Sequence, residues 1–195
     1  MPGLYAAGDA AGVAFQYLTG AFVLGEVAAE QACEYVRHRP ATPVALSQVE
    51  STAREIAAIV GRGNLPEISI HEFEYKVRRI INDYVIPPKN EWKLKNAISW
   101  MRRFREELGR IVQVKDAHEL SRLFEVGFIM ECAELSATAS LARQESRWLP
   151  RHYRTDYPET DDANWLRHVI LRRSADGFPI ATTRPCGPSA AEAKA

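Results

Sequence analysis

The chain has 195 residues, and with 46% hydrophobic and 26% charged residues it has the composition of an ordinary globular protein. Its 25 basic residues balance its 25 acidic residues, so the net charge gives no reason to expect binding to nucleic acid or to an anionic membrane. The three cysteines form no C-x-x-C motif, which argues against a metal site or a disulfide framework and favours a reducing cytoplasm. No stretch reaches the roughly 20 apolar residues that a transmembrane helix needs.

The first 40 residues predict a strand, a turn and a helix. Residues 4–7 have the pattern of a short buried strand, and a turn of small residues follows at 8–12. Residues 18–37 form an Ala-, Val- and Glu-rich segment that predicts a helix, which Pro40 and Pro43 would end.

Four further helices are predicted by the 3.6-residue spacing of apolar residues. They cover residues 46–60, 70–84, 91–112 and 116–143, with Ser69 opening the second and Asp116 as the expected N-cap of the fourth. The positions expected on the apolar face of the fourth helix are Leu120, Leu123, Phe124, Cys132 and Leu135. Short connections between long helices favour an antiparallel helical bundle from about Leu46 to Arg143, and therefore a mainly α fold. Cys33 and Cys132 fall within helices and are expected to be small core residues.

The periodicity ends after this region. Residues 144–162 predict a polar, aromatic-rich loop, and residues 166–172 and 178–183 predict a short β hairpin around the turn at Ala175-Asp176-Gly177.

The turn at residues 8–12 is the first candidate site. A tight turn before a helix N-terminus lets backbone N–H groups approach a polar or anionic group closely, and Asp9 could accept hydrogen bonds from sugar-like hydroxyls. The alternative is an ordinary tight turn without a ligand.

The second candidate site is the loop at residues 145–158, which is rich in Arg, His, Asp and aromatic residues. Such a mixture can bind anions or join structural elements by charge-assisted hydrogen bonds. His152 is either a proton carrier or, as is more usual for a histidine beside arginines, a structural residue.

Both segments resemble known flavoproteins. Pro2-Gly3-Leu4-Tyr5-Ala6-Ala7-Gly8-Asp9 is similar to the last FAD-contacting strand of two-dinucleotide-fold flavoproteins. The loop from Glu145-Ser146-Arg147 to Pro158 resembles the signature Glu-Ser-Arg-Gly-Ala-His-x-Arg-x-Asp-x-Pro of the fumarate reductase and succinate dehydrogenase flavoproteins. The resemblance implies that residues 1–40 end an FAD-binding domain, that 41–145 form a helical bundle domain and that 146–195 form the signature loop, short strands and tail. By the same resemblance, the residues that contact FAD are Gly8, Asp9, Leu18, Thr19 and Gly20.

The chain also departs from this family's pattern. Tyr17 stands where the family has the arginine that grips a dicarboxylate substrate, which argues against succinate or fumarate as substrate. The signature loop is two residues longer, which resembles the adenylylsulfate reductase α subunit. No Gly-x-Gly-x-x-Gly motif is present, so the chain resembles about the last third of such an enzyme, and we do not expect it to be active alone.

Two functions are therefore considered. The first is the C-terminal part or subunit of an FAD-dependent oxidoreductase, which completes the flavin site with an N-terminal flavoprotein portion and docks partners such as an iron-sulfur subunit. The alternative is a non-catalytic helical interaction module derived from such a flavoprotein. No catalytic residue is assigned, and no metal is expected. We expect the signature loop to be a structural clasp built by Glu145, Arg147, His152, Arg154 and Asp156, with Trp148, Tyr153 and Tyr157 as apolar cover.

Overall fold

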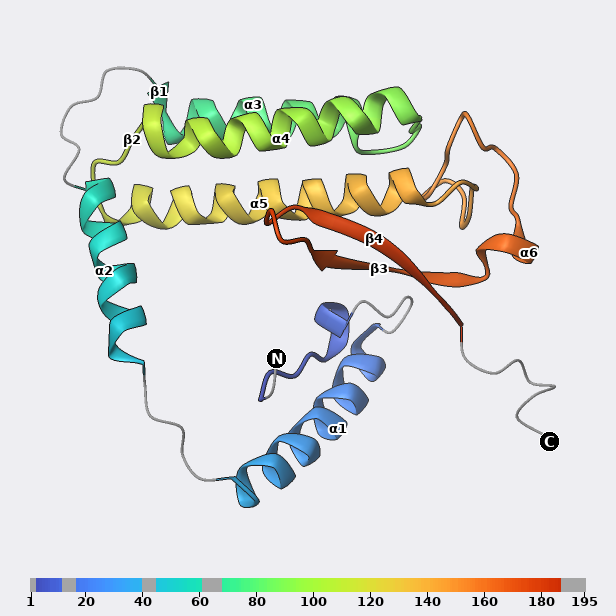
Figure 1. Cartoon of the computed structure of the whole chain (residues 1–195), viewed down its shortest axis with the longest axis horizontal. Coiled ribbons are helices and arrows are strands. Elements are labelled where there is room, and N and C mark those ends of the chain that lie inside the picture. Colours follow the sequence, from blue (N-terminus) through green and yellow to red (C-terminus); the bar gives the residue numbers. More distant parts are fainter. Residues whose placement is uncertain (1–2, 12–16, 40–44, 61–67, 187–195) are drawn as a thin grey trace. The chain divides into compact units, whose positions relative to one another are not determined.

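The computed structural model describes residues 3–11, 17–39, 45–60 and 68–186 (Figure 1). The chain forms two compact units, Met1–Ser51 and Thr52–Ala195. The domain limits expected at residues 40 and 145 stay predictions.

The first unit is built around one long helix, α1 (Tyr17–Arg37), which matches the predicted helix within a residue. A 3₁₀ turn, η1 (Gly8–Ala11), forms in the predicted small-residue turn and packs on α1. Residues 4–7 are not a strand, and the side chain of Leu4 is 70% exposed, so the prediction of a buried strand was wrong. A strand needs a hydrogen-bonding neighbour, and the described part of this unit contains none. The Tyr5 hydroxyl instead donates to the backbone oxygen of Gln31 in α1 at 3.1 Å.

Helix α2 (Leu46–Val60) has the predicted bounds but not the predicted packing. None of its residues is fully buried, and Leu46 is 70% exposed. Ile59 packs against the core formed by the helices that follow. An amphipathic pattern shows that a helix needs an apolar partner, but it does not identify that partner. The expected bundle therefore contains three long helices rather than four.

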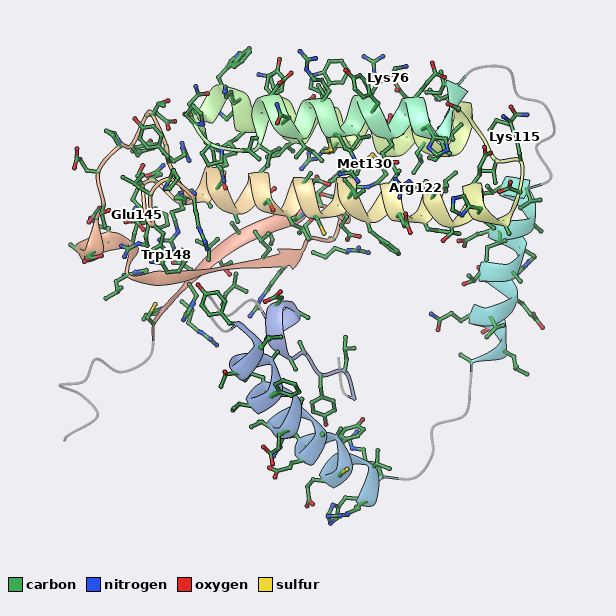
Figure 2. The ribbon with its side chains drawn as sticks, turned by 180° about the vertical axis from the view of Figure 1, so that it is seen from behind. Lys76, Lys115, Arg122, Met130, Glu145 and Trp148 are labelled. Carbon is green, nitrogen blue, oxygen red and sulfur yellow. The ribbon has the colours of Figure 1, made fainter. Side chains whose placement is uncertain are left out.

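The second unit is an antiparallel bundle of α3 (Ile70–Tyr84), α4 (Glu91–Ile111) and α5 (Ala117–Ala142), as Figure 1 shows. Their apolar faces enclose a core that includes Phe73, Phe104 and Met130, and the rings of Phe73 and Phe104 meet edge-on with centroids 5.4 Å apart. Met130 extends from α5 into the space between the helices (Figure 2). The predicted mainly α fold with an antiparallel bundle is confirmed.

A side-chain cap starts each of these three helices. The Ser69 hydroxyl accepts the backbone N–H of Glu72, and the Glu72 carboxylate accepts the backbone N–H of Ser69, each at 3.2 Å, so the two residues form a capping box. Asn90 and Asp116 cap α4 and α5, each accepting a backbone N–H at 2.8 Å. The N-cap predicted at Asp116 is confirmed. These caps explain why the predicted helix starts agree so closely with the structure.

The buried face of α5 differs in part from the predicted face. Leu123 is buried as predicted, but Phe124 is 39% exposed and Cys132 is exposed. The residues that do face the core repeat every three or four positions after Leu123, at Val126, Met130, Ala133 and Ala137. Phe124 lies about 100° around the helix from Leu123, so its large apolar ring misled the prediction. Cys33 in α1 is also exposed, so both cysteines expected in a core lie outside one.

Short β pairs and a one-turn helix complete the second unit. β1 (Ile68–Ser69) pairs in parallel with β2 (Val112–Gln113), which joins the start of α3 to the end of α4. After α6 (Asp162–Trp165), β3 (Arg167–Arg173) and β4 (Pro179–Pro185) form an antiparallel hairpin that packs against α5 (Figure 1). The hairpin predicted from the sequence is confirmed.

Candidate functional site

The turn η1 and the first turn of α1 bring together the residues predicted to contact FAD. Gly8 is buried with φ of 59°, and a Cβ atom built on it would lie 3.3 Å from the Cβ of Ala21. Glycine therefore allows η1 both its backbone conformation and its close approach to α1. Asp9, Leu18 and Thr19 are exposed, and Gly20 is half-buried. Residues 12–16, which link the two groups, lie outside the described ranges.

The second candidate site, residues 145–158, is called the clasp loop below. It follows α5, and Figure 2 labels Glu145 and Trp148 at that end of the helix. Glu145 is fully buried and accepts hydrogen bonds from Arg143, from Arg147 at 2.7 and 2.9 Å, and from the backbone N–H of Asp161 at 2.9 Å. Burial by itself raises the pKa of this carboxyl, but the bonds from Arg147, the Asp161 backbone and Arg143 outweigh burial and hold the pKa below its usual value. Glu145 is thus a buried carboxylate between two arginines.

Arg154 has the largest fully buried side chain of the described residues, at 1% exposed. Its Nε and Nη2 atoms donate to the two Asp156 oxygens at 2.8 and 2.7 Å. Its Nη1 atom donates to the backbone oxygens of Ser140, Leu141 and Arg143 at 2.6, 3.3 and 3.1 Å, so it caps the C-terminal end of α5. The guanidinium is fully satisfied by structural partners.

The hydrogen bonds of Glu145, Arg147 and Arg154 form a network at the end of α5. Asp156 connects this network to a second helix. Its Oδ2 atom accepts the backbone N–H of Glu91, the first residue of α4, at 2.8 Å. The hydrogen bond from Arg154 lowers the pKa of the Asp156 carboxyl against the effect of burial. The carboxylate therefore stays ionised at the positive end of the α4 dipole.

Two further residues of the network were missed by the sequence analysis. Ser146 is fully buried. Its hydroxyl accepts the backbone N–H of Arg154 at 2.9 Å and donates to the backbone oxygen of Tyr157 at 2.8 Å. Lys89, between α3 and α4, is buried and donates from Nζ to the Ser140 hydroxyl at 2.9 Å. Burial, and then the charge of Arg154, lowers the pKa of the Lys89 ammonium. Nothing in the sequence around Lys89, which directly follows Pro87-Pro88, indicates that this lysine is buried.

His152 is half-buried, and its Nε2 atom has no hydrogen-bond partner among the described residues. Burial, together with the positive charges of Lys89, Arg143 and Arg154, lowers the pKa of His152 to about 4. The ring is therefore neutral at pH 7, which favours the structural interpretation over that of a proton carrier.

The expected apolar cover is only partly formed. Tyr153 and Tyr157 are half-buried, and the Arg154 guanidinium lies 5.0 Å from the centroid of the Tyr157 ring. Trp148 is 60% exposed and has a φ of 51°, so it is less buried than the two tyrosines, and its role as cover stays a prediction.

Each carboxylate of the network accepts hydrogen bonds from an arginine side chain. Within the described ranges, no helix is long and apolar enough to cross a bilayer, and no group of three His, Cys, Asp or Glu side chains could hold a metal ion.

Residues 74–188 match the family model described as "Fumarate reductase flavoprotein C-term". The matched region begins within α3 and includes the clasp loop and the hairpin. It covers more than half of the chain.

Several curated proteins share this region. The fumarate reductase flavoprotein subunit of Mycobacterium tuberculosis is 28% identical over 94% of this chain, and that of Haemophilus influenzae is 27% identical over 80%. The succinate dehydrogenase flavoprotein subunit of Coxiella burnetii is 32% identical over 44% of the chain. The chain spans 35% and 26% of the length of the first two relatives, so it corresponds to about a third of them or less.

Solved structures share the fold. Quinol fumarate reductase of E. coli matches 89% of the chain and 30% of its own with a TM-score of 0.70 and 22% identity. The Sdh1 complex of Mycobacterium smegmatis matches 88% of the chain and 30% of its own with a TM-score of 0.71 and 24% identity. The finer resemblance to adenylylsulfate reductase has no support among these relatives and stays a prediction.

The alternative, a non-catalytic helical interaction module derived from such a flavoprotein, is not favoured by these matches, which extend over the bundle, the clasp loop and the hairpin together. The chain belongs to the fumarate reductase/succinate dehydrogenase flavoprotein family and carries its C-terminal domain.

Proposed function

We propose that the chain is the C-terminal part of an FAD-dependent oxidoreductase and that it completes a flavin site together with an N-terminal flavoprotein portion. The observation that carries this proposal is the family match over residues 74–188. Because the chain corresponds to about a third of its relatives or less, the remaining flavin-binding residues must come from another segment or subunit.

The residues around η1 fit a role in holding FAD. Gly8 keeps the backbone close to α1, and the exposed Asp9 carboxylate beside it is free to accept hydrogen bonds from hydroxyls. The exposed side chains of Leu18 and Thr19, with Gly20, would extend this surface along the first turn of α1. When bound, FAD supplies the electron-accepting ring, and these residues position it.

The clasp loop would hold the bundle in place against the flavin-binding portion, since its charged groups already join the ends of α4 and α5. An iron-sulfur subunit is the proposed electron partner, and a reducing cytoplasm is the proposed location. Tyr17, which is 78% exposed, cannot supply a bidentate grip on a carboxylate. We therefore infer that the substrate differs from succinate and fumarate.

Co-expression with the N-terminal flavoprotein portion tests this proposal. The purified complex should show the visible absorbance of bound flavin. Asp9→Ala should lower the flavin content of the complex, whereas Asp176→Ala, in the hairpin turn of the second unit, should not. A stable but colourless complex would instead support the non-catalytic interaction module.

A further inference from the structure

One face of the β3–β4 hairpin is a surface that neither candidate site uses. The side chains of successive strand residues point to opposite faces of a sheet. Arg173 pairs with Glu131 of α5 at 3.5 Å, so the face that carries Arg173 and the half-buried Leu171 is directed towards α5. Arg172 therefore lies on the opposite face, which we call the outer hairpin face.

The outer hairpin face consists of three cross-strand pairs. The register of the two strands places His168 opposite Arg184, Ile170 opposite Thr182 and Arg172 opposite Ile180. All six residues are exposed except Ile170, which is half-buried. Because a strand rises about 3.4 Å per residue, the two arginines lie roughly 14 Å apart along the hairpin. The face thus has a guanidinium group at each end and an isoleucine between them.

The positive charge of this face is not neutralised by the rest of the described structure. Residues 166–186 contain four arginines and one acidic residue, Asp176, which lies in the hairpin turn. Arg173 has its partner on α5, whereas Arg172 and Arg184 form no ion pair with any described residue. Since the whole chain has equal numbers of basic and acidic residues, the outer hairpin face is a local excess of positive charge.

The backbone edge of β4 is less suited to binding than the face. The Ser174 N–H donates to the Phe178 oxygen at 2.8 Å, and hydrogen-bonded pairs alternate along an antiparallel ladder. The even-numbered residues therefore bond within the hairpin, and the odd-numbered residues of β4 point outwards. These include Pro179 and Pro185, which have no N–H to offer. Prolines at both ends of an edge hinder the addition of a further strand, so a partner would bind through side chains.

The same charge pattern disfavours two kinds of partner. A second copy that bound face to face would bring the cationic ends of the two hairpins together, where like charges repel. A nucleic acid carries negative charge along its whole length, whereas this face offers two arginines with an apolar side chain between them.

We propose that the outer hairpin face binds an extended acidic peptide segment of a partner protein. One carboxylate would pair with Arg172 and another with Arg184, and an apolar side chain between them would contact Ile170. In an extended peptide, alternate side chains share a face about 6.8 Å apart, so Glu-x-Val-x-Glu spans the same distance as the two arginines. The proposal does not depend on flavin binding, because the hairpin supplies all three contact residues.

The peptide Glu-Thr-Val-Thr-Glu and its uncharged analogue Gln-Thr-Val-Thr-Gln, both with blocked termini, are the probes. Titration of the ¹⁵N-labelled full chain, followed by NMR, should show saturable shifts from the acidic peptide concentrated at Ile170, Ile180 and Thr182. The uncharged peptide should bind at least about tenfold more weakly, because it forms neither ion pair. Equal affinity for the two peptides, shifts outside the hairpin or the absence of saturable binding would each overturn the proposal.

Matched variants locate the contact on one face. Arg172→Gln and Arg184→Gln should each weaken binding of the acidic peptide about threefold, and the double variant about tenfold. Arg173→Gln is the control, because it removes the same charge from the neighbouring residue on the face towards α5. It should change the affinity by less than about twofold. The NMR spectra of the free variants should show that the hairpin is intact.

Two further results would contradict the proposal. Wild-type affinity in the double variant, or an equal loss in Arg173→Gln and Arg172→Gln, would show that the peptide is not held on the outer hairpin face. Tighter binding of a short oligothymidylate at the same residues would overturn the proposal in favour of a nucleic-acid surface.

Discussion

Arg154 and Asp156 show how one ion pair can serve two helices. The arginine meets the C-terminal carbonyl groups of α5, and the aspartate meets the first N–H of α4. Each charge therefore lies at the helix end whose dipole favours it. This arrangement compensates for the desolvation of a guanidinium that is only 1% exposed.

Removing Arg154 should therefore destabilise the fold. Arg154→Ala leaves Asp156, two α5 carbonyl groups and that of the C-cap Arg143 without their partner, and the free energy of unfolding should fall by about 3–5 kcal/mol. Arg79→Ala, which breaks an exposed pair with Asp83, should cost less than about 1 kcal/mol. Urea denaturation followed by circular dichroism measures both. A variant that unfolds like wild type but inactivates the reconstituted enzyme would place the clasp loop in the active site.

Trp148 occupies a backbone conformation that suits glycine better. Its φ is 51°, and the family signature has Gly after Glu-Ser-Arg. Trp148→Gly should raise the free energy of unfolding by about 1 kcal/mol, because it relieves left-handed strain while removing a mostly exposed side chain. Trp92→Gly is the control: that tryptophan is similarly exposed but lies in α4, so the change should cost about 1 kcal/mol. Destabilisation by Trp148→Gly to the same extent would show that the side chain makes an important contact.

His152 should make the protein sensitive to acid. Its native pKa of about 4 lies below the value of about 6.5 expected in the unfolded chain. Between these pH values the unfolded state binds more protons, so native stability is full above pH 6.5 and falls as the pH is lowered towards 4. Denaturation curves over this window should show a loss on the order of 1–3 kcal/mol that His152→Gln removes and His168→Gln retains. Parallel pH profiles for wild type and His152→Gln would contradict this.

At the scale of the helices, Leu123 and Phe124 offer a direct comparison of the two faces of α5. Leu123 is 5% exposed in the core, while Phe124 is 39% exposed. Leu123→Ala should lower the free energy of unfolding by about 2–5 kcal/mol. Phe124→Ala removes a larger side chain but should cost less, about 1 kcal/mol, because it leaves no buried cavity. If thermal denaturation reversed this order, the buried face of α5 would be misassigned.

The helices could be predicted because their signals are local. Ser69 and Asp116 fix helix starts through bonds to residues three positions later, and such caps are visible in the sequence. The orientation of α5 was less predictable, since Phe124 and Leu123 are both apolar neighbours. Only the packing of the other helices decides which of them is buried.

The ion pairs within the clasp loop could be predicted from the sequence, but the burial of the network and its contacts to the bundle could not. The ion pairs of Arg147 with Glu145 and of Arg154 with Asp156 span two residues each, so the sequence placed the partners close together. Lys89 lies far away in sequence and joins the network only because the bundle brings the start of α4 beside the end of α5. The prediction of a strand at residues 4–7 was wrong because a strand must pair with another segment, which a local sequence pattern does not reveal.

At the scale of the whole molecule, the chain alone should bind FAD weakly or not at all. A small-molecule site usually buries most of its ligand, and η1 with α1 offers only a short exposed surface. Titration with free FAD, followed through quenching of its fluorescence, should show no submicromolar affinity. Tight binding by the chain alone would contradict the view that an N-terminal portion completes the site.

The backbone of Lys89 gives the clasp loop a further property. Its backbone N–H donates to the backbone oxygen of Tyr153 at 2.9 Å, and its backbone oxygen accepts the backbone N–H of Thr155 at 2.8 Å. An irregular loop of this kind would ordinarily tolerate change, but here it is joined to the bundle on both sides. Substitutions in it would act on the amount of folded protein that survives cellular quality control. In a growth assay they would resemble defects in the functional site itself, although the molecules that do fold would be unimpaired.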